Sequence, residues 1–347
     1  MNTPDFSLRL LDWYAEHGRN LPWRQTRDPY RIWISEIILQ QTRVAQGYDY
    51  FLRFIRRFPD VDSLANASED EVLRLWQGLG YYSRARNLHA AARQIQAMGR
   101  FPNTYEEIRR LKGVGDYTAA AIASMAFDLP HAVVDGNVYR VLSRYFGIDT
   151  PIDSTQGKHL FSAMAQEMLV PTRSSDYNQA VMDFGALVCT PKSPSCASCP
   201  LADSCQAYLD GRINELPVKQ HVTRVRNRYF TYVYVRYDGQ TLLQRRADGD
   251  IWQGLYQPPM FETPRPMTPA EVSARVGQYG SPVLLREGYV HQLTHQRLQA
   301  DFYLLECNKH PDLEGLWINE SERDNYAVPR LVEEFFKLVP NPSPDKP

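Results

Sequence analysis

Two carboxylates stand in surroundings where a charged side chain is unusual. Glu36 is the only Asp or Glu between Asp28 and Asp49, in a segment otherwise rich in apolar and amide side chains. Asp135 stands just before a helix predicted at 137–145. Because burial raises the pKa of a carboxyl group and keeps a proton available, Glu36 could serve as a general acid. The ordinary alternatives are a glutamate on a helix surface and an aspartate that caps a helix.

Four of the five cysteines are clustered in one short stretch, with the spacing Cys189-x6-Cys196-x2-Cys199-x5-Cys205. Nothing in residues 1–9 resembles a secretory leader, so clustered cysteines favour metal binding over disulfides. Structural zinc sites usually have two close cysteine pairs, whereas this stretch has one pair with two flanking cysteines. The pattern favours an iron–sulfur cluster. Zinc is the alternative, and the fifth cysteine, Cys307, is expected to be a small buried residue in a strand.

The segment Leu111-Lys-Gly-Val-Gly115 precedes a helix that the sequence predicts from Tyr117. Backbone N–H groups of Gly113, Val114 and Gly115, together with the positive end of that helix, could hold a phosphate. This matters because the net charge of the chain is −1, which excludes a global basic field. Any affinity for nucleic acid must come from local groups of this kind.

These features belong to a longer set of motifs. The others are Leu21-Pro-Trp-Arg24, Gln40-Gln-Thr-Arg-Val44 and Gly78-Leu-Gly-Tyr-Tyr-Ser-Arg-Ala-Arg86. Together they resemble the MutY adenine DNA glycosylases of the endonuclease III superfamily. The resemblance implies a helix-hairpin-helix at 113–115, a [4Fe-4S] cluster on the four cysteines, and double-stranded DNA with adenine opposite 8-oxoguanine or guanine as substrate.

The resemblance also implies roles in catalysis. Glu36 would protonate adenine at N7, and Asp135 would stabilise the cationic sugar, a logic similar to that of a glycoside hydrolase. Tyr117 and Asn137 would position Asp135 and the nucleophile. In bifunctional relatives the position of Tyr117 carries a lysine that attacks the sugar; without that amine, we expect a monofunctional enzyme that uses water.

A flipped base needs a pocket, and the gap it leaves must be filled. The resemblance implies that Gln41 and Tyr81 wedge into the base stack. The remaining residues would line the adenine pocket: Trp23, Arg24, Leu39, Val44 and Gln179. Trp23, Leu39 and Val44 could equally be core residues, and position 179 is glutamate in some relatives.

Residues 227–340 are predicted to form an α+β domain. Strands are expected at 229–235, 241–244 and 299–305 and a helix at 328–338. The stretches 242–246 and 251–259 resemble the MutT-like (Nudix) domain of the MutY family, but the acidic array that holds magnesium in Nudix hydrolases is missing. We therefore expect recognition of 8-oxoguanine rather than hydrolysis, by Leu293, Thr294 and His295. Leu293 replaces an aromatic residue of the family, and these three could instead be ordinary sheet residues.

The predicted fold class is a mainly α helix-hairpin-helix glycosylase domain with a [4Fe-4S] loop, followed by an α+β Nudix-like domain. The predicted boundaries are 1–212 for the first domain with its loop at 189–205, 213–226 for a basic linker, 227–340 for the second domain and 341–347 for a tail. The protein is expected to be monomeric and cytoplasmic, associated with the nucleoid in a bacterium. Three alternatives compete: a thymine or uracil mispair glycosylase, a bifunctional lyase, and a non-catalytic iron–sulfur binder of damaged DNA.

Overall fold

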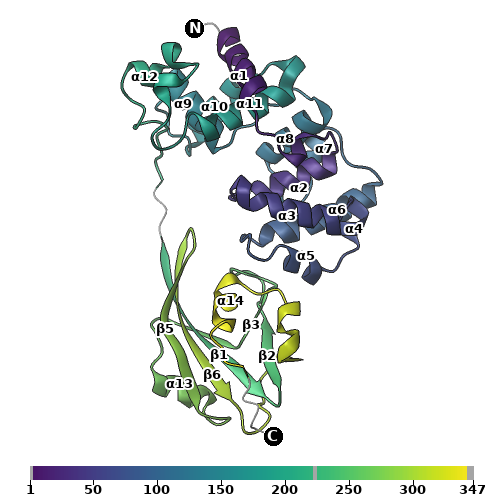
Figure 1. Cartoon of the computed structure of the whole chain (residues 1–347), viewed down its shortest axis with the longest axis vertical. Coiled ribbons are helices and arrows are strands. Elements are labelled where there is room, and N and C mark those ends of the chain that lie inside the picture. The colour runs from purple at the N-terminus through teal and green to yellow at the C-terminus, as the bar shows by residue number, and fades with distance from the viewer. Residues whose placement is uncertain (1–2, 222–224, 342–347) are drawn as a thin grey trace. The chain divides into compact units, whose positions relative to one another are not determined.

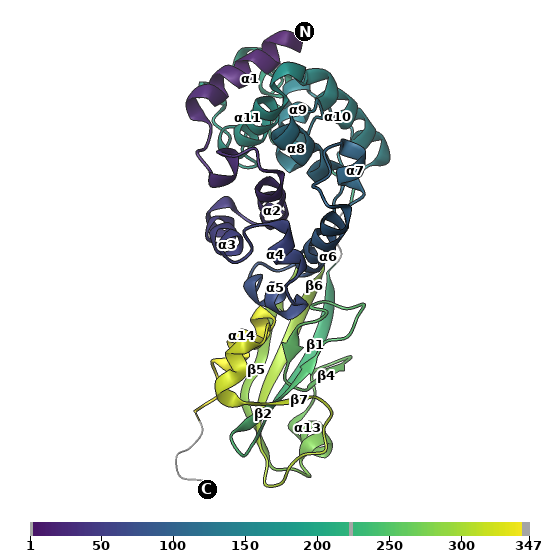
Figure 2. The same ribbon diagram turned by 90° about the vertical axis from the view of Figure 1, so that its right-hand side faces the viewer.

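The computed structural model describes residues 3–221 and 225–341 (Figures 1 and 2). These residues form two compact units. The helical unit comprises residues 3–66 and 87–221, and the sheet unit comprises residues 67–86 and 225–341. Residues 222–224 of the predicted linker and 342–347 of the predicted tail lie outside the described residues. No helix in the described part of the chain is long and apolar enough to cross a membrane.

Three helices of the helical unit, α2, α8 and α11, bury most of their residues. Figure 1 labels them within the unit. Its α-helices are α1 (Thr3–His17), α2 (Pro29–Leu39), α3 (Val44–Arg57), α4 (Val61–Ala65), most of α6 (Ser83–Met98), α7 (Tyr105–Arg109), α8 (Asp116–Phe127), α9 (Gly136–Phe146), α10 (Thr155–Met168), α11 (Ser174–Leu187) and α12 (Gln206–Leu209). Short 3-10 turns lie at Pro22–Arg24, Pro171–Arg173, Cys196–Ser198 and Ala202–Ser204.

The ends of the functional helices follow local rules. Helix α2 begins where the Asp28 side chain accepts a hydrogen bond from the Tyr30 N–H and Pro29 takes the first helical position. Helix α9 begins after Asp135, whose side chain accepts hydrogen bonds from the N–H groups of Asn137 and Val138. It ends at Gly147, whose φ of +68° is a left-handed conformation that suits glycine. The helix predicted at 137–145 is therefore found, one residue longer at each end.

The sheet unit contains a seven-stranded mixed sheet with the order β3-β2-β1-β6-β5, to which β4 and β7 add by pairing with β1 and β2. Strands β1 and β6 are parallel, and the other pairs are antiparallel. The elements are α5 (Glu69–Leu75), β1 (Arg226–Tyr237), β2 (Gln240–Arg245), β3 (Tyr256–Gln257), β4 (Met260–Thr263), α13 (Pro269–Val276), β5 (Pro282–Gln292), β6 (Gln296–Glu306), β7 (Leu316–Asn319), a 3-10 turn (Glu320–Asn325) and α14 (Arg330–Phe336).

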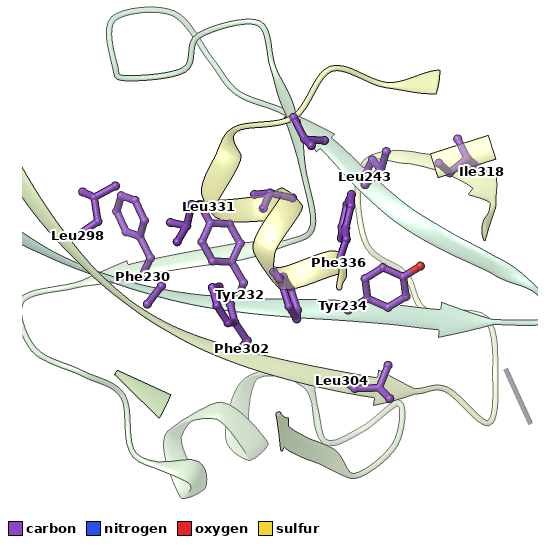
Figure 3. Close-up of a cluster of buried hydrophobic side chains, with 14 residues drawn as sticks. Phe230, Tyr232, Tyr234, Leu243, Leu298, Phe302, Leu304, Ile318, Leu331 and Phe336 are labelled. Carbon is purple, nitrogen blue, oxygen red and sulfur yellow. The ribbon is translucent and has the colours of Figure 1, made fainter. Parts of the chain in front are cut away.

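Alternate side chains of β1 serve two cores. Phe230, Tyr232 and Tyr234 pack with α14 in one buried cluster, which Figure 3 shows. Val233 and Val235 point to the opposite face and pack with α13 in another. This alternation is the period of two that a strand imposes, and it explains why the sheet carries a helix on each face.

Residues 67–86 pack with the sheet unit rather than with the helices that flank them in sequence. Arg245 lies 3.1 Å from Glu69 and 3.3 Å from Asp70. Arg86 donates to the Gln253 carbonyl oxygen at 2.6 Å. These contacts bring the loop that contains Tyr81 into the same compact unit as the C-terminal strands.

The predicted fold class is confirmed, with a mainly helical first part and an α+β second part. The three predicted strands appear as β1, β2 and β6, and the closing helix is α14. Strand β5 was not predicted. Its exposure does not alternate regularly, because two register shifts interrupt its pairing with β6.

Candidate active site and iron–sulfur loop

Glu36 is buried in the middle of α2, with 7% of its surface exposed. The Tyr117 hydroxyl of α8 donates to its Oε2 at 2.9 Å. Burial raises the pKa of Glu36 to about 7, against the opposing effects of the Tyr117 hydrogen bond and the charge of Arg24; the nearby charge of Asp135 raises it further. At neutral pH this carboxyl group therefore holds a proton for a substantial fraction of the time.

Asp135 is the N-cap of α9 and accepts three hydrogen bonds. Its Oδ1 accepts from the N–H groups of Asn137 and Val138, each at 2.8 Å, and its Oδ2 accepts from Asn137 Nδ2 at 2.8 Å. Burial raises its pKa, while these donors and the charge of Arg140 act in the opposite direction. Asp135 is therefore both a helix cap and an oriented carboxyl group.

Arg140 joins this aspartate to the cysteine loop, a connection that the sequence analysis missed. Its guanidinium donates to Asn137 Oδ1 at 2.8 Å, to the Gly185 carbonyl at 2.6 Å and to the Cys189 carbonyl at 2.7 Å. Helix α11 reaches Asn137 closely only because position 185 is glycine. A Cβ there would lie 2.6 Å from Asn137 Cβ.

Of the predicted pocket residues in the helical unit, two are buried and three are partly exposed. Trp23 is buried against Phe51, with ring centroids 5.1 Å apart, so it also serves the core. Gln179 is buried and accepts a hydrogen bond from the Tyr14 hydroxyl at 3.1 Å. Leu39 and Val44 are half-buried, at the end of α2 and the start of α3. The Arg24 side chain is mostly buried and bonded to Asp183, a residue that the sequence analysis did not single out.

The two predicted wedge residues, Gln41 of the helical unit and Tyr81 of the sheet unit, share an unusual backbone. Their φ angles are +57° and +46°, in the left-handed region that non-glycine residues seldom adopt. Both side chains are exposed. Such strain is typical of functional loops that their surroundings hold in place. Near Tyr81, Arg84 provides this support by donating to the carbonyls of Leu79 and Gly80.

The predicted hairpin lies between α7 and α8. Gly113 has a φ of +77°, and a Cβ there would lie 2.6 Å from Asn87 Cβ, so both conformation and space require glycine. Gly113 and Gly115 are exposed, while Val114 is buried and anchors the turn. Gly115 precedes the first residue of α8, so its backbone stands at the positive end of that helix.

The four clustered cysteines line one cavity, together with apolar residues of α9 and α11. Arg144 donates to Cys189 Sγ at 3.5 Å, and the Leu201 N–H donates to Cys199 Sγ at 3.4 Å. Such donors stabilise thiolate ligands. Among the described residues, no three His, Cys, Asp or Glu side chains are grouped as a single metal ion would require. The convergent thiols and the donors to sulfur fit a cluster that joins all four cysteines.

The sheet unit contains a separate pocket with a volume of about 440 Å³. Its walls come from the loop around Tyr81, from Trp252 and from the turn between β5 and β6. The Tyr81 and Thr294 hydroxyls are hydrogen-bonded to each other. Thr294 and His295 are exposed, whereas Leu293 packs against the buried cluster of Figure 3. The structure thus brings two of the three predicted recognition residues to one surface with Tyr81.

Three family models match the chain. Residues 34–166 match the HhH-GPD superfamily of base excision DNA repair proteins, and residues 189–205 match the iron–sulfur binding domain of endonuclease III. Residues 231–338 match the NUDIX domain. The fold and the site therefore define a base excision glycosylase of the helix-hairpin-helix superfamily with a [4Fe-4S] cluster. The cluster, when bound by Cys189, Cys196, Cys199 and Cys205, ties the loop together through iron–thiolate bonds.

The chain belongs to the adenine DNA glycosylase (MutY) family. It is 37% identical over 266 residues to the adenine DNA glycosylase of Buchnera aphidicola subsp. Baizongia pistaciae, covering 75% of each chain. It is 45% identical over 226 residues to the Mus musculus protein, covering 61% of this chain and 44% of that protein. A thermostable thymine-DNA glycosylase structure is 30% identical, with a TM-score of 0.56, covering 60% of this chain and 97% of that one.

Replacing one cluster ligand tests the assignment of the loop. We expect Cys196→Ala to lose most of the bound iron and the visible absorption of the cluster, because three thiolates leave one iron without its protein ligand. Cys307→Ala is the matched control, since this half-buried cysteine lies in the sheet unit and should not affect iron content. Full iron content in Cys196→Ala would contradict the assignment.

Proposed function

We propose that this protein binds duplex DNA in which adenine lies opposite 8-oxoguanine or guanine, extrudes the adenine and hydrolyses its bond to the sugar without cutting the strand. The observation that carries the proposal is the buried Glu36 carboxyl group, whose pKa is raised to about 7 and which accepts a hydrogen bond from Tyr117. A neutral carboxyl group in a pocket is a proton donor at physiological pH.

Adenine leaves poorly as an anion, so a proton must be supplied to it. Glu36 donates its proton to N7, the C1′–N9 bond breaks with its electron pair passing to the base, and a cationic sugar remains. A water molecule then attacks C1′ and gives its proton to the Glu36 carboxylate, which restores the acid. The bases of a duplex are accessible to such chemistry only when flipped out of the stack.

Asp135 faces the opposite requirement, because it must be negative when the sugar becomes positive. Burial raises its pKa, but two backbone N–H groups and Asn137 Nδ2 donate to its oxygens and favour the charged form. Arg140 fixes the Asn137 side chain from its other end. A carboxylate held in this way stabilises developing positive charge without having to reorganise during the reaction.

The absence of strand cleavage rests on position 117. A lyase needs an amine that attacks C1′ and forms an imine. Tyr117 has no amine, and its hydroxyl is engaged with Glu36 and, at 3.4 Å, with Met182 Sδ. Hydrolysis by water is the route that remains to this pair of side chains.

The pocket of the sheet unit supports a role for this unit in recognising the base opposite adenine. It has the size of a small-ligand pocket and combines aromatic, hydroxyl and basic side chains. The Leu293 N–H donates to the Gln296 carbonyl at 2.8 Å, which closes the turn and presents the Thr294 hydroxyl at its surface. That hydroxyl could donate to or accept from an oxidised guanine.

Removing the acid tests the central claim. We expect Glu36→Gln to bind mispaired duplexes normally and to release adenine at least about 100-fold more slowly in single-turnover assays, since the amide cannot supply the proton. The substrates are A opposite 8-oxoguanine, A opposite G and T opposite G, and borohydride trapping is measured in parallel. The exposed Glu167→Gln on α10 is the control. Near-normal adenine release by Glu36→Gln, preferred cleavage of T, or efficient trapping would contradict the proposal.

The pH dependence provides a separate test. Because Glu36 must be protonated, the single-turnover rate should fall as pH rises through about 7. The Tyr117 hydroxyl stabilises the charged carboxylate, so Tyr117→Phe should raise the pKa of Glu36 and move this fall to higher pH. Tyr105→Phe, which loses a hydrogen bond to Asp116 instead, is the control. An unchanged profile, or a fall at lower pH, would be inconsistent with this role for Tyr117.

Thr294 can be tested without changing the shape of the turn. Thr294→Val removes the hydroxyl, and we expect the preference for A opposite 8-oxoguanine over A opposite G to drop roughly 10-fold, the equivalent of one hydrogen bond. Thr263→Val is the control, since its hydroxyl bonds to the Arg265 carbonyl in another part of the sheet unit. If the ratio of the two rates stays at its original value, Thr294 does not discriminate between these bases.

A further inference from the structure

Asp183 is a fully buried carboxylate in the middle of α11. Arg24 donates to both of its oxygens, from Nη1 to Oδ2 at 2.6 Å and from Nη2 to Oδ1 at 2.7 Å. Arg19 adds its backbone N–H at 3.1 Å and its Nε at 2.9 Å. Burying a carboxylate is costly unless it is paired and fully hydrogen-bonded, and here one carboxylate serves two guanidinium groups.

Of the two arginines that bind Asp183, Arg24 is the one that affects Glu36. Its side chain is only 12% exposed, and its positive charge opposes the rise in the pKa of Glu36. The guanidinium carbon lies 5.8 Å from the centre of the Tyr14 ring. The polar and charged groups that affect the pKa of Glu36 are Tyr117 from α8, which donates to it, Arg24 from the Pro22–Arg24 turn and Asp135 before α9.

The same face of α11 also holds a second predicted pocket residue. Gln179 lies four residues before Asp183, one turn of the helix away. Its Nε2 donates to Ser175 Oγ at 3.1 Å, while its Oε1 accepts from the Tyr14 hydroxyl at 3.1 Å. Helix α11, which packs against α1 (Figure 1), therefore holds Gln179 and Arg24 in one connected network with Tyr14.

We propose that Asp183 is a positioning residue of the adenine pocket, whose bidentate contact fixes the Arg24 guanidinium in the network that also contains Tyr14 and Gln179. The inference rests on the proposed function, because it takes Glu36 as the acid. Two parallel N–H···O bonds fix both the distance and the plane of a guanidinium, which a single contact does not do.

A double-mutant cycle separates positioning from simple structural support. Asp183→Asn keeps the shape but turns N–H donors toward Arg24. We expect adenine release to fall roughly 10- to 100-fold at a pH well below 7, where Glu36 is protonated in every variant, because a displaced Arg24 no longer orients the base. Arg24→Met should cause a loss of similar size. If Asp183 acts through Arg24, the double variant should be no slower than Arg24→Met alone. Losses that multiply in the double variant would overturn the proposal.

The pH profile supplies a readout that a structural role would not move. The positive charge of Arg24 favours the charged form of Glu36, so displacement of Arg24 should move the fall in rate to higher pH. We expect this shift in both Asp183→Asn and Arg24→Met, with no further shift in the double variant. An unchanged profile in Asp183→Asn, or a shift to lower pH from an unpaired Arg24 that stays in place, would overturn the proposal.

Controls separate failure of this proposal from failure of the proposed function. Asp176→Asn, on the same helix but paired with Arg173 near the surface, should leave rate and profile unchanged. Cluster absorption and circular dichroism report folding. If Asp183→Asn does not fold, Asp183→Glu replaces it, because the longer side chain keeps the charge and displaces Arg24. The fall in rate should then move to higher pH by a smaller amount than in Asp183→Asn. An unshifted pH profile refutes the proposal. Activity in Glu36→Gln would instead refute the proposed function.

Discussion

The burial of one carboxyl group, Glu36, is the constraint on which the candidate active site depends. Burial raises its pKa to about 7, while Tyr117 and Arg24 oppose any further rise. Stronger burial would make it too weak an acid to protonate a base, and weaker burial would leave it ionised at neutral pH. The packing of α2 against α8 and the anchoring of Arg24 on α11 set this balance.

Much of the architecture could be predicted because it is encoded locally. The cysteine spacing, the glycines of the hairpin and the cap at Asp135 each lie within a few residues of sequence. The [4Fe-4S] cluster and the fold class are confirmed, whereas the roles of the site residues stay predictions. Asp183 and Arg140 could not be predicted, because their function depends on tertiary contacts. Asp183 and Arg24 are separated by 159 positions in the sequence.

In the sheet unit, too, features that depend on tertiary contacts could not be predicted from the sequence. Strand β1 was predictable because its alternation is regular, but β5 lies at the edge of the sheet and its pattern is broken by register shifts. No sequence signal showed that residues 67–86 pack with these strands, because a long-range ion pair such as Arg245 with Glu69 has no local signature. The contact between Tyr81 and Thr294 is invisible for the same reason.

Because alternate side chains of β1 pack into two different cores, the strand constrains how recognition can change over evolution. Strand β1 pairs with β6 without interruption from Arg226 opposite Gln296 to Arg236 opposite Glu306, and a slip of one residue would exchange its two cores. The register is therefore fixed, and with it the starting point of the turn at 293–295. Substitutions at the exposed positions of that turn leave this register intact. If this turn reads the base opposite adenine, as proposed, its preference can change while the folding of the sheet stays the same.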